Sequence, residues 1–360
     1  MRLQSSPALA GLIWLALCGF AQPPVPALDY DLPELDAPDG PGPTDPDRVA
    51  DRSVPLVALE APAPSSAQFF LTVDASITAD SNVTNATDDD SIPIHNGEVT
   101  FPVPLDPAIR ARADLALGAS VSAGARLPVA PGAAFALDAE GYAIELDGSR
   151  NDDLSVLIAA GPELTWTENG RAFVQVTAFE RWYGGISASQ GYGLRARYQQ
   201  QVATGHRVSL SLDVRIFDSD YGVDFRGTQA GAYLTYDRVL NAQMMGSLGV
   251  YARRDWLVGE AYSGAELGIY AGISRYLGPS LSGAVSAGIS RMLFDAPILF
   301  LSPGAREDVR VYTTFSLTTR KPIGWNLFPS LSYSYHRNQS SISFFDADRH
   351  RVRLGLLRSF

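Results

Sequence analysis

The chain has 360 residues, of which 46% are hydrophobic and only 19% charged, and its formal net charge is -11. This length allows one large domain or two ordinary ones, and the charged fraction is low beside the roughly one quarter of a typical soluble domain. The acidic balance argues against the basic face by which proteins bind nucleic acid. A single cysteine excludes an intrachain disulfide and a structural zinc site built on thiolates.

Residues 1–21 have the layout of a cleaved secretory signal peptide. A positively charged start is followed by an apolar run of 13 residues, and the small residues Gly19 and Ala21 mark a cleavage site. The run is shorter than the roughly 18 residues that suggest a membrane-spanning helix. A lipoprotein signal, cut before Cys18, is disfavoured because Leu17 stands where a small residue is usual. The sequence therefore predicts an exported protein.

Residues 22–66 have a different composition, with 11 prolines, nine acidic residues and only two basic ones. Such a segment cannot bury enough apolar surface to offset the entropy that is lost on ordering. We therefore expect an extended, disordered and acidic leader before the folded domain. It could act as a spacer or docking arm, but an inert linker is favoured because no defined binding motif occurs in it.

From residue 67 to the end of the chain, apolar and polar residues alternate, and no window shows sustained helical periodicity. Residues 71–77, 208–216, 309–319 and 352–360 each place apolar side chains at every second position. A period of two indicates β-strands with one apolar and one polar face. The sequence therefore predicts an all-β domain over residues 67–360.

The apolar positions of these strands are often small or medium-sized, and the polar positions hold Arg, Asp, Gln and Ser along many consecutive strands. This pattern is typical of a wall with lipid on one face and a wet lumen on the other, whereas a soluble sandwich would hide its apolar face. The connections also alternate in length, as in outer-membrane barrels. Short turns are expected at residues 128–132, 168–170, 203–206, 240–243, 278–280 and 320–324, and longer loops at residues 80–109, 147–152, 184–190, 218–225, 253–261, 295–307 and 337–347.

These 13 connections imply about 14 strands, an even number as bacterial outer-membrane barrels require. We therefore predict a transmembrane antiparallel β-barrel of about 14 strands in the bacterial outer membrane, with both of its ends on the periplasmic side. Amphipathic aromatic rings prefer the membrane interfaces. The aromatic residues expected there are Trp166, Trp182, Tyr183, Tyr276 and Trp325.

The chain ends in Phe360, which is preceded at alternate positions by Leu356, Leu354 and Val352. A terminal aromatic residue with alternating apolar residues before it resembles the insertion signal that the barrel assembly machinery reads. Arg358 departs from this pattern, since an apolar residue is usual two positions before the end, but its long side chain can reach the polar rim. Leu354, Leu356 and Phe360 are therefore the predicted insertion signal.

Charged residues at polar positions of the strands are expected to point into the lumen. They occur as closely spaced pairs, which are Arg195 and Arg197, Asp213 and Arg215, and Arg351 and Arg353. Mixed signs along the wall could form a charged ladder that fixes the wall and shapes the field that a passing molecule meets. A lumen wall without selectivity is an equally good interpretation.

The four histidines form no recognisable catalytic motif. His95 lies in the long first loop and His206 in a turn on the opposite side of the membrane, while His336 and His350 flank the last loop near two aspartates. Because surface loops commonly collect such residues, we do not expect an enzyme, and a barrel hydrolase with a His–Asp pair near the last loop is the third hypothesis. The acidic run at residues 88–90 could bind a divalent cation, but it lacks the spacing of a calcium loop, so a solvated charge run is favoured. No cofactor and no metal site is predicted.

Several segments carry a family resemblance. Residues 80–87 (DSNVTNAT) resemble the element that opens the barrel of the surface lipoprotein assembly modifier family, residues 328–341 and 348–360 resemble its closing hairpin, and residues 181–185 (RWYGG) resemble a mid-barrel element. The resemblance covers residues 67–360, and its ends are more specific than its middle. The positions that match the family's motifs are Asp80, Ser81, Asn82, Asn85, Trp182, Gly184, Pro329, Ser340 and Arg349.

The resemblance implies a translocator that moves a lipoprotein, or a small secreted client, across the outer membrane to the cell surface. Full-length members also carry a periplasmic domain of helical repeats, whereas residues 22–66 are too short and too rich in proline for such repeats. We therefore expect either a separate protein for client capture or a barrel-only relative with altered function. A porin-like diffusion channel for small solutes is the alternative, because a barrel of about 14 strands has room for a lumen. The expected partners are outer-membrane lipid, lipopolysaccharide, the barrel assembly machinery and the client, and we expect a monomer.

Residues 80–109 form the longest predicted loop. Long loops in compact domains are usually functional or disordered. The later part, residues 99–105, is apolar and stiffened by prolines, which is unusual for a segment in water. We expect this loop to fold into the barrel mouth and narrow the lumen as a gate; a mobile loop packed on lipopolysaccharide is the alternative.

Overall fold

The computed structural model describes residues 66–96, 99–146, 152–167 and 170–360. The predicted signal peptide, residues 1–21, and the predicted leader up to residue 65 lie outside the described residues. In the part of the chain that is described, no helix is long and apolar enough to cross a membrane.

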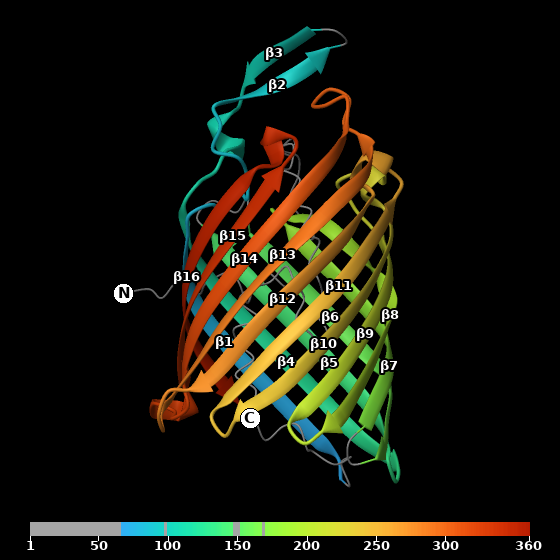
Figure 1. The fold of residues 1–360 in the computed structure, drawn as a ribbon, viewed down its shortest axis with the longest axis vertical. Coiled ribbons are helices and arrows are strands. Elements are labelled where there is room, and N and C mark those ends of the chain that lie inside the picture. Colours follow the sequence, from blue (N-terminus) through green and yellow to red (C-terminus); the bar gives the residue numbers. More distant parts are fainter. Residues whose placement is uncertain (1–65, 97–98, 147–151, 168–169) are drawn as a thin grey trace, which may run out of the picture.

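Fourteen antiparallel strands form one closed barrel, which confirms the predicted fold. The strands follow one another around the wall in sequence order, and β1 meets β16 to close it (Figure 1). The barrel strands are β1 (Gln68–Asp80), β4 (Asp114–Ala130), β5 (Ala133–Leu146), β6 (Asp153–Thr167), β7 (Gly170–Tyr183), β8 (Ile186–Ala203), β9 (His206–Asp218), β10 (Gly227–Asn241), β11 (Met244–Leu257), β12 (Gly264–Tyr276), β13 (Leu281–Pro297), β14 (Ala305–Thr319), β15 (Phe328–Ser340) and β16 (Ala347–Ser359).

A separate two-stranded sheet lies within the connection between β1 and β4. It consists of β2 (Ser91–Asn96) and β3 (Val99–Pro104), and Figure 1 shows it beyond the end of the barrel that is opposite to the C-terminus. We call that end the loop end and the other the turn end. Short 3-10 helices in the connections are η2 (Pro107–Ile109), η3 (Val223–Phe225), η4 (Glu260–Tyr262), η5 (Gly324–Asn326) and η6 (Ser343–Phe345).

The two faces of the wall differ as the alternation predicts. On β12, Leu267 and Ile269 are 66% and 52% exposed, whereas Glu266 and Tyr270 are only 3% and 4% exposed. The exposed apolar set continues around the barrel and forms its outer face, and the buried, largely polar set points inward. An apolar outer belt around a polar interior is the arrangement that a lipid environment requires.

The barrel strands have between 13 and 18 residues, more than the roughly 10 that are enough to cross a bilayer. At a rise of about 3.3 Å per residue and a tilt of about 40°, 13 residues reach about 33 Å along the barrel axis. The apolar band of such barrels is about 25 Å tall. The strands therefore extend past the membrane.

Each of the six expected short turns falls at the junction of two consecutive strands. At the loop end the strands extend further than expected, so the expected loops at residues 253–261, 295–307 and 337–347 overlap the ends of β11, β13 and β15. The expected loop at residues 184–190 is wrong, because Gly184 and Gly185 alone form the turn and β8 begins at Ile186. Their φ angles are 57° and 81°. Two consecutive residues with positive φ make a tight turn whose twist matches that of the strands, so β7 and β8 continue up to it.

Candidate functional site

Charged side chains point into the barrel on β8 and β9. Arg195 and Arg197 are 3% and 2% exposed, whereas the preceding Leu194 is 57% exposed on the outer face. Arg195 lies directly opposite Asp213 in the strand register, and Arg215 Nε lies 3.5 Å from Asp213 Oδ2. The structure thus places these four charged residues beside one another on the inner face.

Arg351 and Arg353 of β16 lie on the inner face too, because Val352 and Leu354 at the alternate positions are exposed on the outer face. Arg353 forms an ion pair with Asp74 of β1. In the closed order of the strands, β16 is seven positions from β9 in either direction. The two arginine-bearing parts of the wall therefore face each other across the lumen.

A cluster of charged and hydroxyl side chains on the inner face could not be predicted from the sequence. It centres on Glu266, whose Oε1 accepts hydrogen bonds from the hydroxyls of Ser290 and Tyr251 at 2.6 and 3.0 Å. Its Oε2 lies 3.0 Å from Arg253 Nη2 and 3.5 Å from Arg310 Nη1. A buried carboxylate is tolerated when partners compensate its charge. These residues come from four strands, β11 to β14, so only the strand register could have revealed the cluster.

A second compensated cluster lies on β4 to β7. Arg126 Nη1 lies 2.8 Å from Asp138 Oδ1, and its Nε lies 3.0 Å from Glu163 Oε2. Gln175 Nε2 donates to Asp138 Oδ2 at 2.6 Å. Ion pairs therefore occur on both sides of the lumen, and they give it a polar wall whose opposite charges are close together.

Tyrosine rings line the wall between β10 and β14. Tyr251, Tyr270 and Tyr312 are buried and form one aromatic cluster. Each ring lies against a glycine of a neighbouring strand, and a Cβ atom added there would overlap the ring. The pairs are Tyr251 with Gly268, Tyr270 with Gly249, and Tyr312 with Gly288. Because the glycines leave room, the rings can lie along the wall instead of across the lumen.

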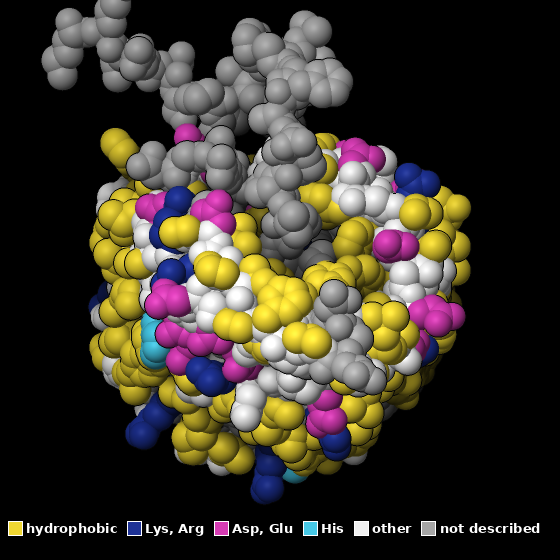
Figure 2. Space-filling model, turned by 90° about the horizontal axis from the view of Figure 1, so that it is seen from above, with side chains coloured by type: hydrophobic (Ala, Val, Ile, Leu, Met, Phe, Trp, Pro, Cys, Tyr) yellow, Lys and Arg dark blue, Asp and Glu magenta, His cyan; other side chains and the backbone are white. Residues whose placement is uncertain are grey.

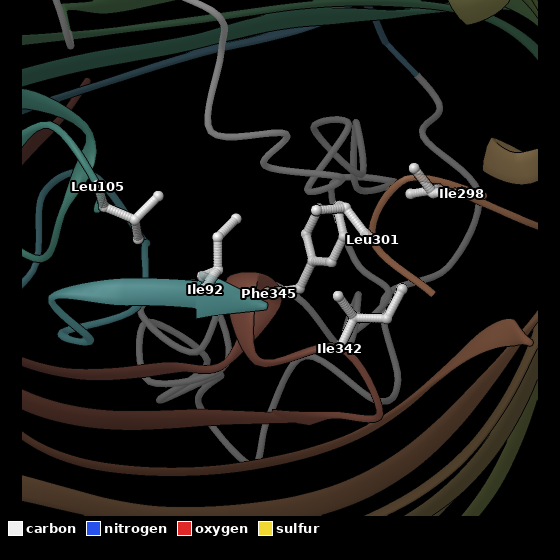
Figure 3. Close-up of a cluster of buried hydrophobic side chains, with 6 residues drawn as sticks. All are labelled: Ile92, Leu105, Ile298, Leu301, Ile342 and Phe345. Carbon is white, nitrogen blue, oxygen red and sulfur yellow. The ribbon is translucent and has the colours of Figure 1, made fainter. Parts of the chain in front are cut away.

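Apolar side chains from the connections pack together at the loop end. They come from the connections that follow β1, β13 and β15, which are neighbours around the rim, and Ala261 and Tyr262 of the connection after β11 pack against them. Figure 2 views this end and shows hydrophobic side chains between acidic and basic ones. We call this group the mouth cluster; its buried members, shown in Figure 3, are Ile92, Leu105, Ile298, Leu301, Ile342 and Phe345.

Arg306, near the start of β14, links the mouth cluster to the wall. Its guanidinium carbon lies 3.9 Å from the ring centroids of both Phe294 and Phe345. Its Nη2 lies 2.8 Å from Asp308 Oδ2. A cation between two aromatic rings and beside a carboxylate is held by the ring quadrupoles and by Coulomb attraction. This contact fixes the connection after β15 over the inner wall.

Tyr262, which packs against the mouth cluster, also contacts the connection after β9. Its ring centroid lies 4.8 Å from that of Phe225, in the connection after β9. Burial raises the pKa of the Tyr262 hydroxyl above its usual value; the Asp224 carboxylate adds to this rise, and the Arg306 guanidinium opposes it. The hydroxyl therefore stays neutral at neutral pH, which suits a ring packed against apolar side chains.

The expected gate at residues 80–109 is wrong in its main feature. Ile92 and Leu105 do join the mouth cluster, but the β2–β3 hairpin between them stands beyond the barrel (Figure 1). At its far end Val99 and Phe101 are 61% and 42% exposed. The segment pairs with itself as a hairpin, so its backbone hydrogen bonds are satisfied without insertion into the mouth.

The residues after β1 form a hydrogen-bonded turn against the last strand. Asn82 is 1% exposed, and its Nδ2 donates to the carbonyls of Ala86 and Asp348 at 2.8 and 3.1 Å. Its Oδ1 accepts from the Ala86 N–H at 3.2 Å. Asn85, with a φ of 47°, has the left-handed conformation that asparagine tolerates. One amide side chain thus holds the turn and attaches it to β16.

Two further contacts join the same turn to β16. Arg349 Nη2 and Nε donate to Asp80 Oδ2 at 2.7 and 3.0 Å, and the His350 N–H donates to Ser81 Oγ at 2.8 Å. Asp80 and Arg349 are 269 residues apart in the sequence. The structure therefore brings Asp80, Ser81, Asn82 and Arg349 together where the first and last strands close the barrel.

Two of the histidines contact tyrosine hydroxyls. His206 Nδ1 lies 2.5 Å from the Tyr236 hydroxyl, on the turn end. His350 Nδ1 lies 2.9 Å from the Tyr333 hydroxyl, and its Nε2 is 4.0 Å from Asp348. Among the described residues, no group of three or more His, Cys, Asp or Glu side chains is placed to hold a metal ion.

The model of one protein family, described as surface lipoprotein assembly modifier, matches residues 70–360. The chain belongs to this family. The match covers the barrel from β1 to β16, and it agrees with the resemblance seen in the sequence. Together with the apolar belt of the closed barrel, family membership supports an outer-membrane location.

Solved structures with similar barrels have little sequence identity with this chain. DcaP, an outer-membrane channel of Acinetobacter baumannii, is 12% identical with a TM-score of 0.46, over 83% of this chain and 99% of that chain. OprD of Pseudomonas aeruginosa is 11% identical with a TM-score of 0.42, over 84% and 97%. A FadL homologue of Pseudomonas aeruginosa is 10% identical with a TM-score of 0.43, over 82% and 89%. A search of curated proteins found no significant match.

The other positions that resemble motifs of the surface lipoprotein assembly modifier family lie in separate places. Trp182 and Gly184 are at the loop end of β7. Pro329, near the start of β15, lies opposite Leu356. Ser340 ends β15, and its N–H donates to an aspartate oxygen of the next connection at 2.5 Å. The structure therefore does not bring these four residues to the turn that Asp80 and Arg349 share.

The predicted insertion signal lies at the turn end of β16. Leu354, Leu356 and Phe360 are all exposed on the outer face. The Phe360 N–H donates to the carbonyl of Leu71 at 2.8 Å, so the last residue is still paired with β1. Arg358, which departs from the pattern, places its guanidinium 4.3 Å from the centroid of the Phe360 ring.

Proposed function

We propose that this barrel is an outer-membrane translocator that moves a lipoprotein, or a small secreted client, from the periplasm to the cell surface. The observation that carries this proposal is the match of the surface lipoprotein assembly modifier family to residues 70–360, which include all but the first two residues of the barrel. The client would arrive at the turn end and leave at the loop end. The protein would reach the membrane by means of the signal peptide and the barrel assembly machinery, and it would act as a monomer among lipid and lipopolysaccharide.

The inner wall suits a polypeptide cargo. Many of its charged groups form ion pairs within the wall, as Glu266 does with Arg253 and Arg310. A passing chain therefore meets a polar surface with hydrogen-bonding groups, and charges that are paired in this way are less able to trap it. Arg195, Arg197, Asp213, Arg215, Arg351 and Arg353 are the side chains that we propose shape the field along this path.

We expect the mouth cluster to move when a client leaves at the loop end. It joins connections from β1, β11, β13 and β15 through apolar contacts and not through a covalent link. Such a cluster holds the loops over one side of the mouth, and a client that offers apolar side chains can exchange with it. The loop end would then open for a client and close again after release.

The test uses cells that produce a candidate client, such as a lipoprotein or small secreted β-protein encoded beside this gene. The client is labelled with a membrane-impermeant reagent, with and without the barrel. We expect surface labelling that depends on the barrel, while a periplasmic marker stays unlabelled. A client that remains unlabelled, although the barrel is folded in the outer membrane, would refute the proposal.

A porin-like channel for small solutes is the second candidate. The observation in its favour is the polar inner face, which continues around all the strands of the barrel. Planar-bilayer recordings of the purified barrel separate the two functions. A large, steady conductance together with no client export would favour the channel, whereas little resting conductance together with client export would favour the translocator.

A further inference from the structure

Among the described barrel strands, β1 and β16 are the one neighbouring pair that no connection joins. We call their boundary the seam. They pair over nine residues, Thr72 to Asp80 in β1, whereas the other neighbours pair over 11 to 14 residues. Opening any other boundary would also strain the turn or loop that links its strands. The seam is therefore where the wall can open with the smallest loss of pairing.

The seam is held shut from the inside. Two ion pairs cross it on its inner face, one between Asp80 and Arg349 and one between Asp74 and Arg353. Both arginine side chains are 21% exposed, so they can be reached from the lumen. Carboxylates and amides of a polypeptide in the lumen could exchange with these partners, because charge-assisted hydrogen bonds of this kind form readily with any suitable group.

The outer side of the seam is apolar. Val73 and Ile77 of β1, and Leu354 and Leu356 of β16, are exposed there. An acyl chain would be stable against these side chains in the hydrocarbon, and it would be excluded from a lumen lined by ion pairs. The two sides of the seam therefore suit the two parts of a lipid-modified protein.

We propose that the seam is a lateral slot for acylated clients. The polypeptide of the client moves through the lumen, its acyl chains stay in the bilayer, and the short link between them passes between β1 and β16. This inference rests on the proposed translocator function and adds the route that the acyl chains of a lipoprotein client take. Because the link travels from one membrane face to the other, the seam opens along its whole length as the two ion pairs exchange.

A disulfide across the seam tests the slot. Thr72 and Ser359 lie opposite each other, and their hydroxyl oxygens are 3.3 Å apart. The Phe360 N–H donates to the carbonyl of Leu71, so the next pair inward, Thr72 and Ser359, is a non-hydrogen-bonded one, in which Cβ atoms lie closest. A Thr72→Cys, Ser359→Cys variant therefore suits a disulfide and keeps both ion pairs. The one native cysteine, Cys18, belongs to the predicted signal peptide.

The control disulfide joins two strands that a turn already links. Thr314 of β14 and Ser334 of β15 lie opposite each other on the inner face. The Ser341 N–H donates to the Glu307 carbonyl, so these two residues form a hydrogen-bonded pair. Because the two kinds of pair alternate along antiparallel strands, Thr314 and Ser334 form a non-hydrogen-bonded pair. A Thr314→Cys, Ser334→Cys variant thus carries the same chemistry in the same wall. It leaves the seam free.

The experiment follows the surface delivery of one lipoprotein client in two forms. The first form is acylated. In the second form the acylated cysteine is replaced, and an ordinary cleavable signal peptide exports the protein without acyl chains. Folding of each barrel variant is checked by heat-modifiable mobility on gels. We expect the oxidised seam variant to lose delivery of the acylated form, to keep delivery of the unacylated form, and to recover after reduction. The oxidised control variant should deliver both forms. If the seam variant does not fold, Ser76→Cys with Gly355→Cys places the disulfide at another directly opposite pair and keeps both ion pairs.

Three results would overturn the slot. Undiminished delivery of the acylated form through the oxidised seam would show that acyl chains take another path. Loss of both forms in the seam variant alone would show that the seam sets the width of the lumen and does not pass acyl chains. If the wild-type barrel delivers neither form, the translocator function fails, and the slot fails with it.

Discussion

Replacement of Glu266 by glutamine removes one charge from the centre of an inner cluster and leaves its size almost unchanged. Arg253 and Arg310 then lose the carboxylate that lies 3.0 and 3.5 Å from them. Removal of one partner from a buried ion pair typically costs about 3–5 kcal/mol. Arg253 keeps Asp255 at 3.6 Å, and Arg310 keeps Asp308 at 3.9 Å. We therefore expect the lower end of that range, about 3 kcal/mol.

The matched control is Glu307→Gln on the outer face. Glu307 Oε1 lies 2.6 Å from Arg291 Nη2, but the two side chains are 41% and 60% exposed. An exposed ion pair contributes little to stability, because water and salt screen it. The control thus removes the same charge from the same wall with little expected effect.

The assay is urea unfolding of both variants in lipid vesicles, followed by heat-modifiable gel mobility and tryptophan fluorescence. A loss of about 3 kcal/mol corresponds to about a hundredfold change in the unfolding equilibrium, and it lowers the urea midpoint if the slope of the transition is unchanged. A Glu266→Gln midpoint equal to those of wild type and Glu307→Gln would refute the view that the inner charges are buried and compensated.

Four further outcomes are expected. Deletion of Phe360 should lower the folded fraction in outer membranes, since the last strand must pair to close the barrel; unchanged folding would count against an insertion signal. Removal of residues 22–66 behind the native signal should leave a folded barrel in a gel-mobility assay, because the leader has few apolar side chains to contribute. Asn82→Ala should destabilise the barrel by roughly 1–3 kcal/mol in urea unfolding, because buried backbone groups lose their partner. Burial raises the pKa of the Tyr262 hydroxyl in the folded protein, so the stabilisation that this side chain gives to the loops is full below the unfolded pKa of 10.0 and is lost as the pH rises above that value. Proteolysis of the loops should therefore increase at alkaline pH in wild type more than in Tyr262→Phe.

The barrel could be predicted from sequence because its signals are local. Alternation within a strand, as at Leu267 to Tyr270, assigns each residue to a face without knowledge of its neighbours in space. The same local rule predicts that Arg195 and Arg197 lie inside. Turn positions are local too, because glycine marks most of them. The failure at Gly184 and Gly185 has a local cause as well, since two consecutive glycines allow a tighter turn than the loop that was expected.

The partners of the inner charges could not be predicted in this way. Glu266 has arginine neighbours on β11 and β14, and the sequence offers many arginines at equivalent inward positions. Only the relative shift of the strands selects among them, and a shift of one residue exchanges the faces. The mouth cluster has the same character, because Ile92 and Ile342 meet only after the barrel has closed. Contacts across strands thus depend on register, which the sequence pattern leaves open.

The seam offers a physical reason for the expectation that the two ends of the barrel resemble the family more specifically than its middle does. At every other boundary a turn or loop sets the register of the two strands, so their side chains need not specify it. No connection sets the register between β1 and β16, whose partners lie at opposite ends of the sequence. Side chains must therefore select it, and the contacts of Asn82 with Asp348 and of Asp80 with Arg349 are placed to do so. The ion pair of Asp80 and Arg349 helps to select this register and can also be reached from the lumen. The same residues would therefore link the closure of the barrel to the passage of a client.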